Sequence, residues 1–128
     1  MTKRRSKEEK IIIVDDDKDL CNLLCDIIED EGFMVDGAYD GSSALNKISE
    51  QMFDLMIVDN KLSGTDGLSV VKLSKKLNPE IQSIMISAYG NDATRTMAKE
   101  LGVFEFVDKP FEIKFLIDKV NEALFNGP

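Results

Sequence analysis

Histidine is absent from the 128-residue sequence, and cysteine occurs only twice. Cys21 and Cys25 stand four residues apart in a segment of helical period, and a metal site built on them would need further thiols or histidines, which the chain lacks. We therefore interpret both cysteines as small packing residues. Low-complexity segments are absent as well, so the chain is expected to form one globular domain.

Long apolar runs are also missing. No run approaches the length that crosses a membrane, and the apolar residues 11–14 are followed at once by acid, so this end of the chain lacks the apolar middle region of a secretory signal. The protein is therefore expected to be cytoplasmic and to have no membrane partner.

Positive charge is scarce beyond the first ten residues. Residues 1–10 hold five lysines or arginines and two glutamates, whereas the rest of the chain has 11 basic and 22 acidic residues, a net charge of −11. Such an acidic body repels a phosphate backbone, so direct nucleic-acid binding by this domain is not expected. We expect a flexible basic leader at residues 1–9, a folded domain at residues 10–125 and a C-terminal tail at residues 126–128.

What the chain does have is a regular alternation. Apolar runs, the strongest of them typical of strands buried on both faces, alternate five times with segments whose apolar residues recur at helical spacing. This pattern predicts an α/β fold, a doubly wound (βα)5 domain with a five-stranded parallel sheet and helices on both faces. The predicted strands are residues 11–14, 33–39, 53–59, 81–87 and 103–107.

A helix is predicted after each of these strands. Asp40 or Ser42 is expected to cap the second helix, because both side chains can accept a hydrogen bond from a free backbone N–H. The helical spacing predicts that certain apolar residues face the sheet, among them Leu23, Leu73 and Ile113.

Polar side chains come at the ends of four predicted strands. Asp15 and Asp16 follow the first strand, Asp59 ends the third, Ser87 ends the fourth and Lys109 follows the fifth. Ligands of open α/β sheets bind outside the carboxyl ends of the strands, so these groups are expected to converge at one mouth. Taken singly, an aspartate can cap a helix or form a turn, a serine can bond within a loop, and a lysine can be solvated. Their coincidence at one edge favours a site.

Three carboxylates cannot share a small space while ionised unless a cation joins them. A set of oxygen ligands without histidine suits a hard ion, and Mg²⁺ is the ion we expect. Because Mg²⁺ takes one or two carboxylates together with waters and phosphate oxygens, the site is expected to receive a phosphoryl group. Lys109 and Ser87 would then hold the other phosphoryl oxygens.

Four motifs occur in the order found in a known family: "VDD" (14–16), "DLMIVDNKLSGTDG" (54–67), "ISAYG" (86–90) and "FVDKPF" (106–111). On these motifs residues 10–125 resemble the receiver domains of two-component response regulators, of the single-domain chemotaxis type. The resemblance implies a flavodoxin-like sheet with strand order 2-1-3-4-5. It also implies a separate phosphodonor, a sensor histidine kinase or a histidine phosphotransfer protein, since this chain has no histidine.

The resemblance assigns roles to the acids at the mouth. Asp59 would be the phosphoacceptor, attacking a phosphohistidine of the partner. Asp16 and Asp59 would ligate Mg²⁺ directly, the backbone carbonyl of Lys61 would be a third protein ligand, and Asp15 would act mainly through water.

The remaining site residues follow from the same resemblance. Ser87 and Lys109 would bind phosphoryl oxygens, and Phe106 would be the aromatic residue that turns inward when Ser87 shifts. Lys61 and Ala88 occupy positions that are associated in the family with the lifetime of the acyl phosphate. We expect Lys61 to restrict the attacking water and lengthen that lifetime.

Two departures from the family pattern bear on the switch. Many receivers read Met-Pro-Gly where this chain has Leu62, Ser63 and Gly64, so the loop is expected to be more mobile. Phe106 replaces the tyrosine of many relatives and removes a hydroxyl that could report the active state.

The function implied by the resemblance is a phosphorylation-dependent switch, a regulatory phosphoacceptor and not an enzyme in the ordinary sense. A downstream effector protein or output domain would read its helix four, strand five and helix five, residues 91–120. An intermediate carrier in a multi-step phosphorelay is an alternative. A Mg²⁺-dependent aspartyl phosphatase is a third, although such enzymes resembling haloacid dehalogenases need an acid where this chain has Lys61.

Overall fold

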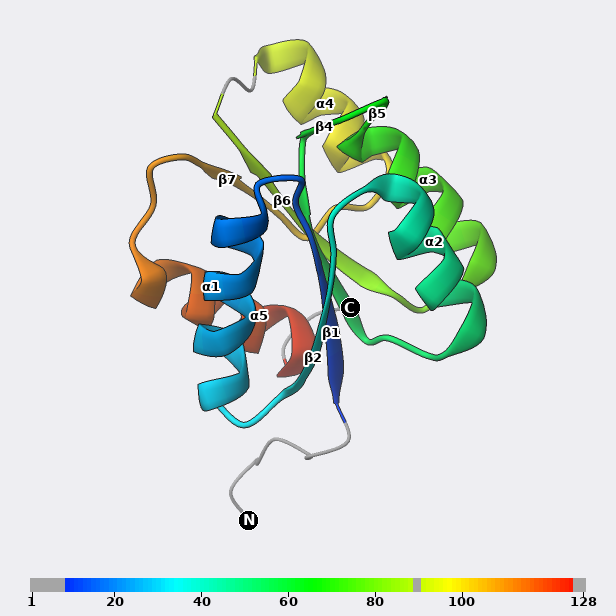
Figure 1. The fold of residues 1–128 in the computed structure, drawn as a ribbon. Coiled ribbons are helices and arrows are strands. Elements are labelled where there is room, and N and C mark those ends of the chain that lie inside the picture. The colour runs from blue at the N-terminus through cyan, green and yellow to red at the C-terminus, as the bar shows by residue number, and fades with distance from the viewer. Residues whose placement is uncertain (1–8, 89–90, 126–128) are drawn as a thin grey trace.

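Five parallel strands form one sheet in the order β2-β1-β3-β6-β7 in a computed structural model that describes residues 9–88 and 91–125 (Figure 1). Counted within this sheet, the order is 2-1-3-4-5, which confirms the flavodoxin-like topology. The strands are β1 (Lys10–Val14), β2 (Met34–Ala38), β3 (Leu55–Asp59), β6 (Gln82–Ser87) and β7 (Glu105–Asp108).

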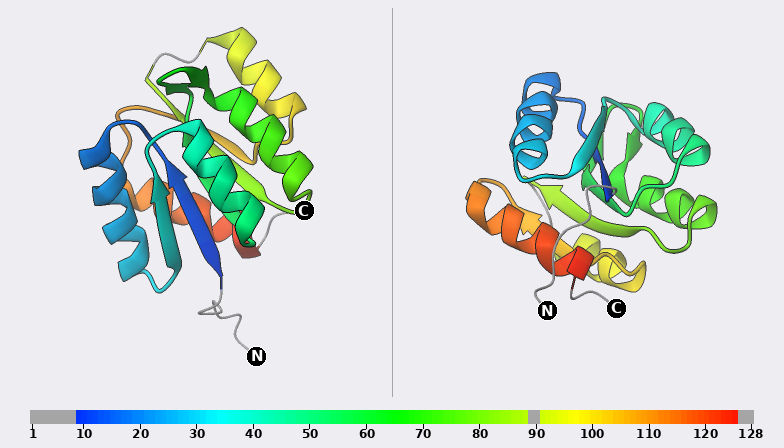
Figure 2. Two further views of the ribbon diagram at one scale, coloured as in Figure 1. Left: turned by 45° about the vertical axis from the view of Figure 1, so that its right-hand side comes forward. Right: turned by 90° about the horizontal axis from the view of Figure 1, so that it is seen from below.

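Five helices cover the two faces of this sheet. Helices α1 and α5 lie on one face, and α2, α3 and α4 lie on the other (Figures 1 and 2). Their bounds are α1 (Lys18–Asp30), α2 (Gly41–Glu50), α3 (Gly67–Leu77), α4 (Asp92–Glu100) and α5 (Ile113–Phe125). Within the described ranges, no helix is long and apolar enough to cross a membrane.

Side chains cap the helices that follow β1 and β2. The carboxylate of Asp17 accepts a hydrogen bond from the N–H of Leu20 at the start of α1. Asp40 does the same for Ser43 at the start of α2, so Asp40, and not Ser42, caps this helix. Each cap satisfies a backbone N–H that has no partner within the helix.

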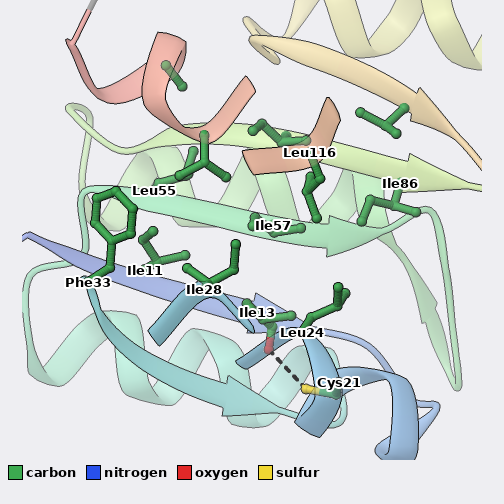
Figure 3. Packing of buried hydrophobic residues seen from close by; sticks show 14 residues of the cluster. Ile11, Ile13, Cys21, Leu24, Ile28, Phe33, Leu55, Ile57, Ile86 and Leu116 are labelled. Carbon is green, nitrogen blue, oxygen red and sulfur yellow. Dashed lines mark hydrogen bonds between the residues drawn. The ribbon is translucent and has the colours of Figure 1, made fainter. Parts of the chain in front are cut away.

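The continuous apolar strands divide their side chains between two cores. Ile11 and Ile13 of β1 point to the face covered by α1 and α5, where Ile13 packs near Leu24 and Cys21 (Figure 3). Ile12 and Val14 point to the opposite face. Because side chains alternate along a strand, a central strand covered on both faces must be apolar at every position. The prediction for Cys21 is confirmed, because its free thiol is buried in the first core.

Three predicted inward-facing residues prove to be exposed, Leu23, Leu73 and Ile113, and those predictions were wrong. In α1 the buried residues are Cys21, Leu24 and Ile28, and Leu23 lies about 100° around the helix from Leu24. Helix α1 has more apolar residues than its buried face holds. Helical spacing alone therefore does not decide which residues at the edge of that face, such as Leu23, point inward. The fifth strand also begins later than expected, at Glu105 instead of residue 103.

The loop between β3 and α3 contains a hairpin that the sequence did not predict. Its strands are β4 (Lys61–Leu62) and β5 (Thr65–Asp66), which pair antiparallel. The predicted leader and tail lie outside the described residues apart from Glu9. The carbonyl of Glu9 accepts a hydrogen bond from the N–H of Met34 at 3.0 Å, so this residue extends the pairing of β1 with β2.

Candidate functional site

The carboxyl ends of β1, β3 and β6 lie next to one another in the sheet, with β7 beside β6. This order brings Asp15, Asp59 and Ser87 to one edge, where the chain leaving β7 adds Lys109. All three side chains that end or follow the central strands are buried, although their residue types are polar. Buried polar groups require partners, so the contacts made at this edge define the site.

Asp59 is the last residue of β3 and is 9% exposed. One carboxylate oxygen, Oδ1, accepts a hydrogen bond from the N–H of Lys61 at 2.9 Å. The other, Oδ2, accepts one from Nζ of Lys109 at 2.8 Å. The charge of Asp59 is therefore met by a backbone donor on its own loop and by a cation from the far end of the chain.

Lys109 joins two acids. Its Nζ lies 2.8 Å from Oδ2 of Asp59 and 3.9 Å from Oδ2 of Asp15. Burial alone would lower the pKa of Lys109, but the hydrogen bond and charge of Asp59, with the charge of Asp15, outweigh burial and hold the pKa above its ordinary value. The ammonium group is thus charged when the site is at work. The peptide bond from Lys109 to Pro110 is cis.

Asp15 is the most buried acid of the site, with 2% of its surface exposed. Its Oδ1 accepts a hydrogen bond from the N–H of Asp17 at 2.9 Å. Burial, with a smaller contribution from the charge of Asp59, raises the pKa of Asp15 to about 6, although Asp17 and Lys109 act in the opposite direction. Burial is therefore the main reason that the charged form of Asp15 is disfavoured, ahead of repulsion by Asp59.

Asp16 makes a different contact from the other acids. Its exposed carboxylate accepts a hydrogen bond from Oγ of Ser63, at 2.9 Å, on the hairpin loop. Within the part of the chain that the structure describes, no three acidic, cysteine or histidine side chains form a group that could hold a metal ion. Asp15 and Asp59 lie around Lys109, and Asp16, whose charge also acts on Asp15, is held by the hydroxyl of Ser63.

The donor set nevertheless suits Mg²⁺, which takes one or two protein carboxylates and keeps several waters. The residues that would hold it are Asp16 and Asp59, with the carbonyl of Lys61 beside Asp59 and Asp15 through water. Two observations support this fit. All these donors are oxygens, and the charge of Asp59 adds to burial in raising the pKa of Asp15, so a cation placed here would favour the ionised form of the acids.

Ser87 ends β6 and is buried, and its hydroxyl lies 3.5 Å from Nδ2 of Asn60, which donates to it. Its carbonyl accepts a hydrogen bond from the N–H of Lys109 at 2.8 Å. The backbone of Asn60 is also tied to β6, since its N–H donates to the carbonyl of Ile86 at 2.7 Å. Ala88 follows Ser87 and is exposed.

The predicted switch aromatic, Phe106, is half-buried in β7. The guanidinium carbon of Arg95, on α4, stands 4.6 Å from the centre of its ring. Arg95 also donates to both carboxylate oxygens of Asp108. One arginine thus covers the ring and binds the residue before Lys109. Lys61, the predicted modulator of lifetime, begins β4 and is exposed.

Three residues that hold this arrangement were not predicted as site residues: Asn60, Ser63 and Arg95. Asn60 directly follows Asp59, so its place in the motif is a signal that could have identified it. Ser63 differs from the family pattern, and this difference drew attention to the position. It did not indicate the contact with Asp16, which lies 47 residues away in the sequence. Arg95 and Asp108 are 13 residues apart and belong to different elements, so no local spacing indicates their contact.

Comparisons with known proteins agree with this geometry. A family model for the response regulator receiver domain matches residues 11–121. Sporulation initiation phosphotransferase F of Bacillus subtilis is 34% identical over 116 residues, which are 91% of this chain and 94% of that protein. Nitrogen assimilation regulatory protein NtrX of Azorhizobium caulinodans is 36% identical over 116 residues, 89% of this chain but only 26% of NtrX.

A solved structure shows the same fold. The crystal structure of a response regulator receiver domain protein (CheY-like) from Methanospirillum hungatei JF-1 matches with a TM-score of 0.90 and 28% identity, covering 94% of this chain and 96% of that one. The family match spans most of the chain, and the strand order found here is the one implied by the sequence motifs. The chain therefore belongs to the response regulator receiver domain family.

Proposed function

We propose that this domain is a phosphorylation-dependent signalling switch in which Asp59 accepts a phosphoryl group from a phosphohistidine of a partner kinase or phosphotransfer protein. The observation that carries the proposal is the Asp59 carboxylate, nearly buried at the end of β3 and paired with Lys109 at 2.8 Å. Lys109 also reaches the buried Asp15, but at 3.9 Å, so Asp59 is the acid that it holds directly.

The transfer itself is a displacement at phosphorus. A carboxylate oxygen of Asp59 forms the new P–O bond while the P–N bond to histidine breaks, and the imidazole nitrogen leaves with the bonding pair and takes up a proton. Phosphoryl transfer depends mainly on positioning and charge neutralisation. When bound, Mg²⁺ supplies positive charge for the phosphoryl oxygens.

The residues of this chain provide the rest. Lys109 holds Asp59 before the reaction, and its ammonium group can bind a phosphoryl oxygen once the acyl phosphate has formed. Ser87 would donate its hydroxyl to another phosphoryl oxygen, at the cost of its 3.5 Å contact with Asn60. The movement of Ser87 would then be passed to Phe106 and to the α4, β7 and α5 surface.

Incubation with acetyl phosphate and Mg²⁺ tests the phosphoacceptor. Intact mass is expected to show a single added phosphoryl group in the wild type and none in Asp59→Asn. Asp54→Asn is the matched control, because Asp54 precedes β3 at its opposite end and is exposed. Absence of the adduct, an adduct that persists in Asp59→Asn, or rapid turnover of unrelated phosphate esters would reject the proposal, the last in favour of an aspartyl phosphatase.

Lys61 is the residue we expect to set the lifetime of this adduct. Its backbone N–H binds the acceptor carboxylate and its side chain is exposed next to it, where it can restrict an approaching water. Phosphate release from the purified acyl phosphate should be about three- to tenfold faster in Lys61→Ala, a barrier change of about 1 kcal/mol. Equal rates of phosphate release in wild type and Lys61→Ala would show that Lys61 does not set the lifetime of the adduct.

A phosphorelay carrier is the second candidate. It is favoured by the match to sporulation initiation phosphotransferase F, which this chain covers over 94% of its length. A carrier passes the phosphoryl group from Asp59 to a histidine of a further protein, whereas a terminal switch retains it until hydrolysis. Adding a histidine phosphotransfer protein to the phosphorylated domain distinguishes a carrier from a terminal switch. Only a carrier passes the phosphoryl group to that protein faster than it releases inorganic phosphate.

A further inference from the structure

The hydroxyl of Ser63 connects two segments of the site that are distant in sequence. It donates to Oδ2 of Asp16 at 2.9 Å, across 47 residues of chain. Asp16 belongs to the segment after β1, and Ser63 belongs to the loop after Asp59. This contact is a side-chain hydrogen bond between the acceptor loop and an acid expected to ligate Mg²⁺, and it places Asp16 toward that loop.

The position of the hydroxyl is fixed by the β4–β5 hairpin. Leu62 pairs with Thr65 across the turn, so Ser63 and Gly64 form its two central residues. Gly64 has φ of +80°, the conformation required at the third position of a type II turn, and Leu62 is buried and anchors the strand. Ser63 is therefore presented by an ordered turn and not by an irregular loop.

The hydrogen bond restricts the side-chain conformation of Asp16 but leaves most of its carboxylate lone pairs free for a cation. An ionised carboxylate has two oxygens and about four lone-pair sites, and Ser63 uses one of them on Oδ2. Asp16 is exposed, so without this donor its side chain would exchange among rotamers in water. Holding an acidic ligand in place lowers the entropy that an incoming cation must remove, and hydrogen bonds to ligating carboxylates commonly change metal affinity.

We propose that Ser63 is a positioning residue for the cation site, where its hydroxyl holds Asp16 toward the acceptor loop and strengthens Mg²⁺ binding. The inference rests on the proposed function, because it takes Asp16 as a metal ligand. The proline that many receivers carry at this position has no hydroxyl and could not make this contact. Ser63 acts through Asp16 and touches neither the phosphoryl group nor the reacting oxygen.

Calorimetric titration of the unphosphorylated domain with Mg²⁺ tests the proposal. Ser63→Ala should raise the dissociation constant about three- to tenfold, at or below the low end of the roughly 10–100-fold typical of residues that orient a metal ligand, because Asp16 is exposed to water. Ser63→Thr keeps the hydroxyl and should bind like the wild type. Ser69→Ala, an exposed serine on α3, controls for the loss of a surface hydroxyl.

A second measurement separates positioning from a general structural effect. Phosphorylation by acetyl phosphate should require more Mg²⁺ for half-maximal rate in Ser63→Ala, while the rate at saturating Mg²⁺ and the thermal midpoint stay unchanged. Equal or tighter Mg²⁺ binding by Ser63→Ala, or a loss in Ser63→Thr as large as in Ser63→Ala, would overturn the proposal. Its failure leaves the phosphoryl adduct of the wild type intact, whereas failure of the proposed function removes that adduct. A wild type that binds no Mg²⁺ would overturn this inference whatever the adduct shows.

Discussion

The acceptor end of the sheet and the α4–β7 side of the same domain are held by different forces. At the acceptor end, Asp15 and Asp59 are buried and tied by backbone donors and by Lys109. The chain also folds back so closely that a Cβ on Gly67 would stand 2.4 Å from the carbonyl oxygen of Asp59. This region is fixed by steric contact and by charges out of water.

On the α4–β7 side, fewer residues are buried and the connecting side chains are more exposed to water. Ala98 is the one buried residue of α4, whereas α1, α2 and α3 each bury at least three. The pair of Arg95 and Asp108 connects α4 to β7, with side chains 40% and 59% exposed. Exposed ion pairs contribute little net stability, so this side can rearrange at small cost while the acceptor end stays in place.

The largest predicted effect breaks the acceptor end. Gly67→Ala should destabilise the domain by about 3 kcal/mol or more, because the new Cβ overlaps backbone that cannot move without displacing Asp59. The yield of phosphorylation by acetyl phosphate should fall together with the stability. Urea unfolding and the yield of adduct measure the two effects.

Gly64→Ala is the matched control for Gly67→Ala. Gly64 also requires a special backbone, with φ of +80°, but a Cβ there would meet no atom within 4 Å. The expected loss is only about 1–2 kcal/mol, the conformational cost of a left-handed residue. If the two variants lose the same stability, close approach to Asp59 is not what distinguishes the acceptor end.

A smaller effect concerns the buried charge of the acceptor end. The pKa of Asp15 is about 6 in the folded protein and 3.8 ordinarily, so the folded state holds this proton more tightly than the unfolded state. The stability associated with Asp15 is therefore complete below about pH 4 and is lost as the pH rises through 6. Asp15→Asn should avoid that loss and gain about 1–3 kcal/mol at neutral pH.

Urea unfolding in the presence of a metal chelator, followed from about pH 4 to pH 8, checks this prediction. The stability difference between Asp15→Asn and wild type should be smallest in acid and reach a plateau above the pKa of Asp15. Asp26→Asn, at an exposed aspartate of α1, controls for the change of net charge. Parallel profiles for Asp15→Asn and wild type would show that burial at this end carries no electrostatic cost.

The acceptor end is also the part of the molecule that the sequence predicts best. Asp15, Asp59 and Ser87 directly end or follow apolar runs, and parallel strands carry their carboxyl ends to one edge whatever the details of packing. The strand order and the roles of these residues came from the resemblance to a family, since alternation of elements alone does not order a sheet.

The remaining features depend on interactions without a local signature. The two-residue strands β4 and β5 are too short to show a period, so the turn at Ser63 and its bond to Asp16 could not be predicted. Asp16 is exposed and can turn toward water or toward any nearby polar group. Its place in the sequence therefore does not predict that it binds Ser63. The pair of Arg95 and Asp108 depends on how α4 packs against β7, which local patterns do not determine.

The smallest predicted effect concerns Arg95 on the α4–β7 side. Arg95→Ala removes both the ion pair with Asp108 and the contact with the Phe106 ring, yet it should lower global stability by less than about 1 kcal/mol. Amide hydrogen exchange in α4 should become about two- to fivefold faster, because local opening no longer breaks these contacts. Exchange in α1 should not change.

Two further variants identify which property of Arg95 matters. Arg95→Lys keeps the charge and can still pair with Asp108, where the single nitrogen Nη2 binds both carboxylate oxygens, but it loses the planar guanidinium over the Phe106 ring. Its exchange rate in α4 should therefore lie between those of wild type and Arg95→Ala. Lys99→Ala removes a cation from the same helix and should leave exchange unchanged. Uniform acceleration in α1 and α4 would mean that Arg95 supports the whole domain. The exposed side would then be as much a part of the fixed framework as the acceptor end, and a switch would need to break both.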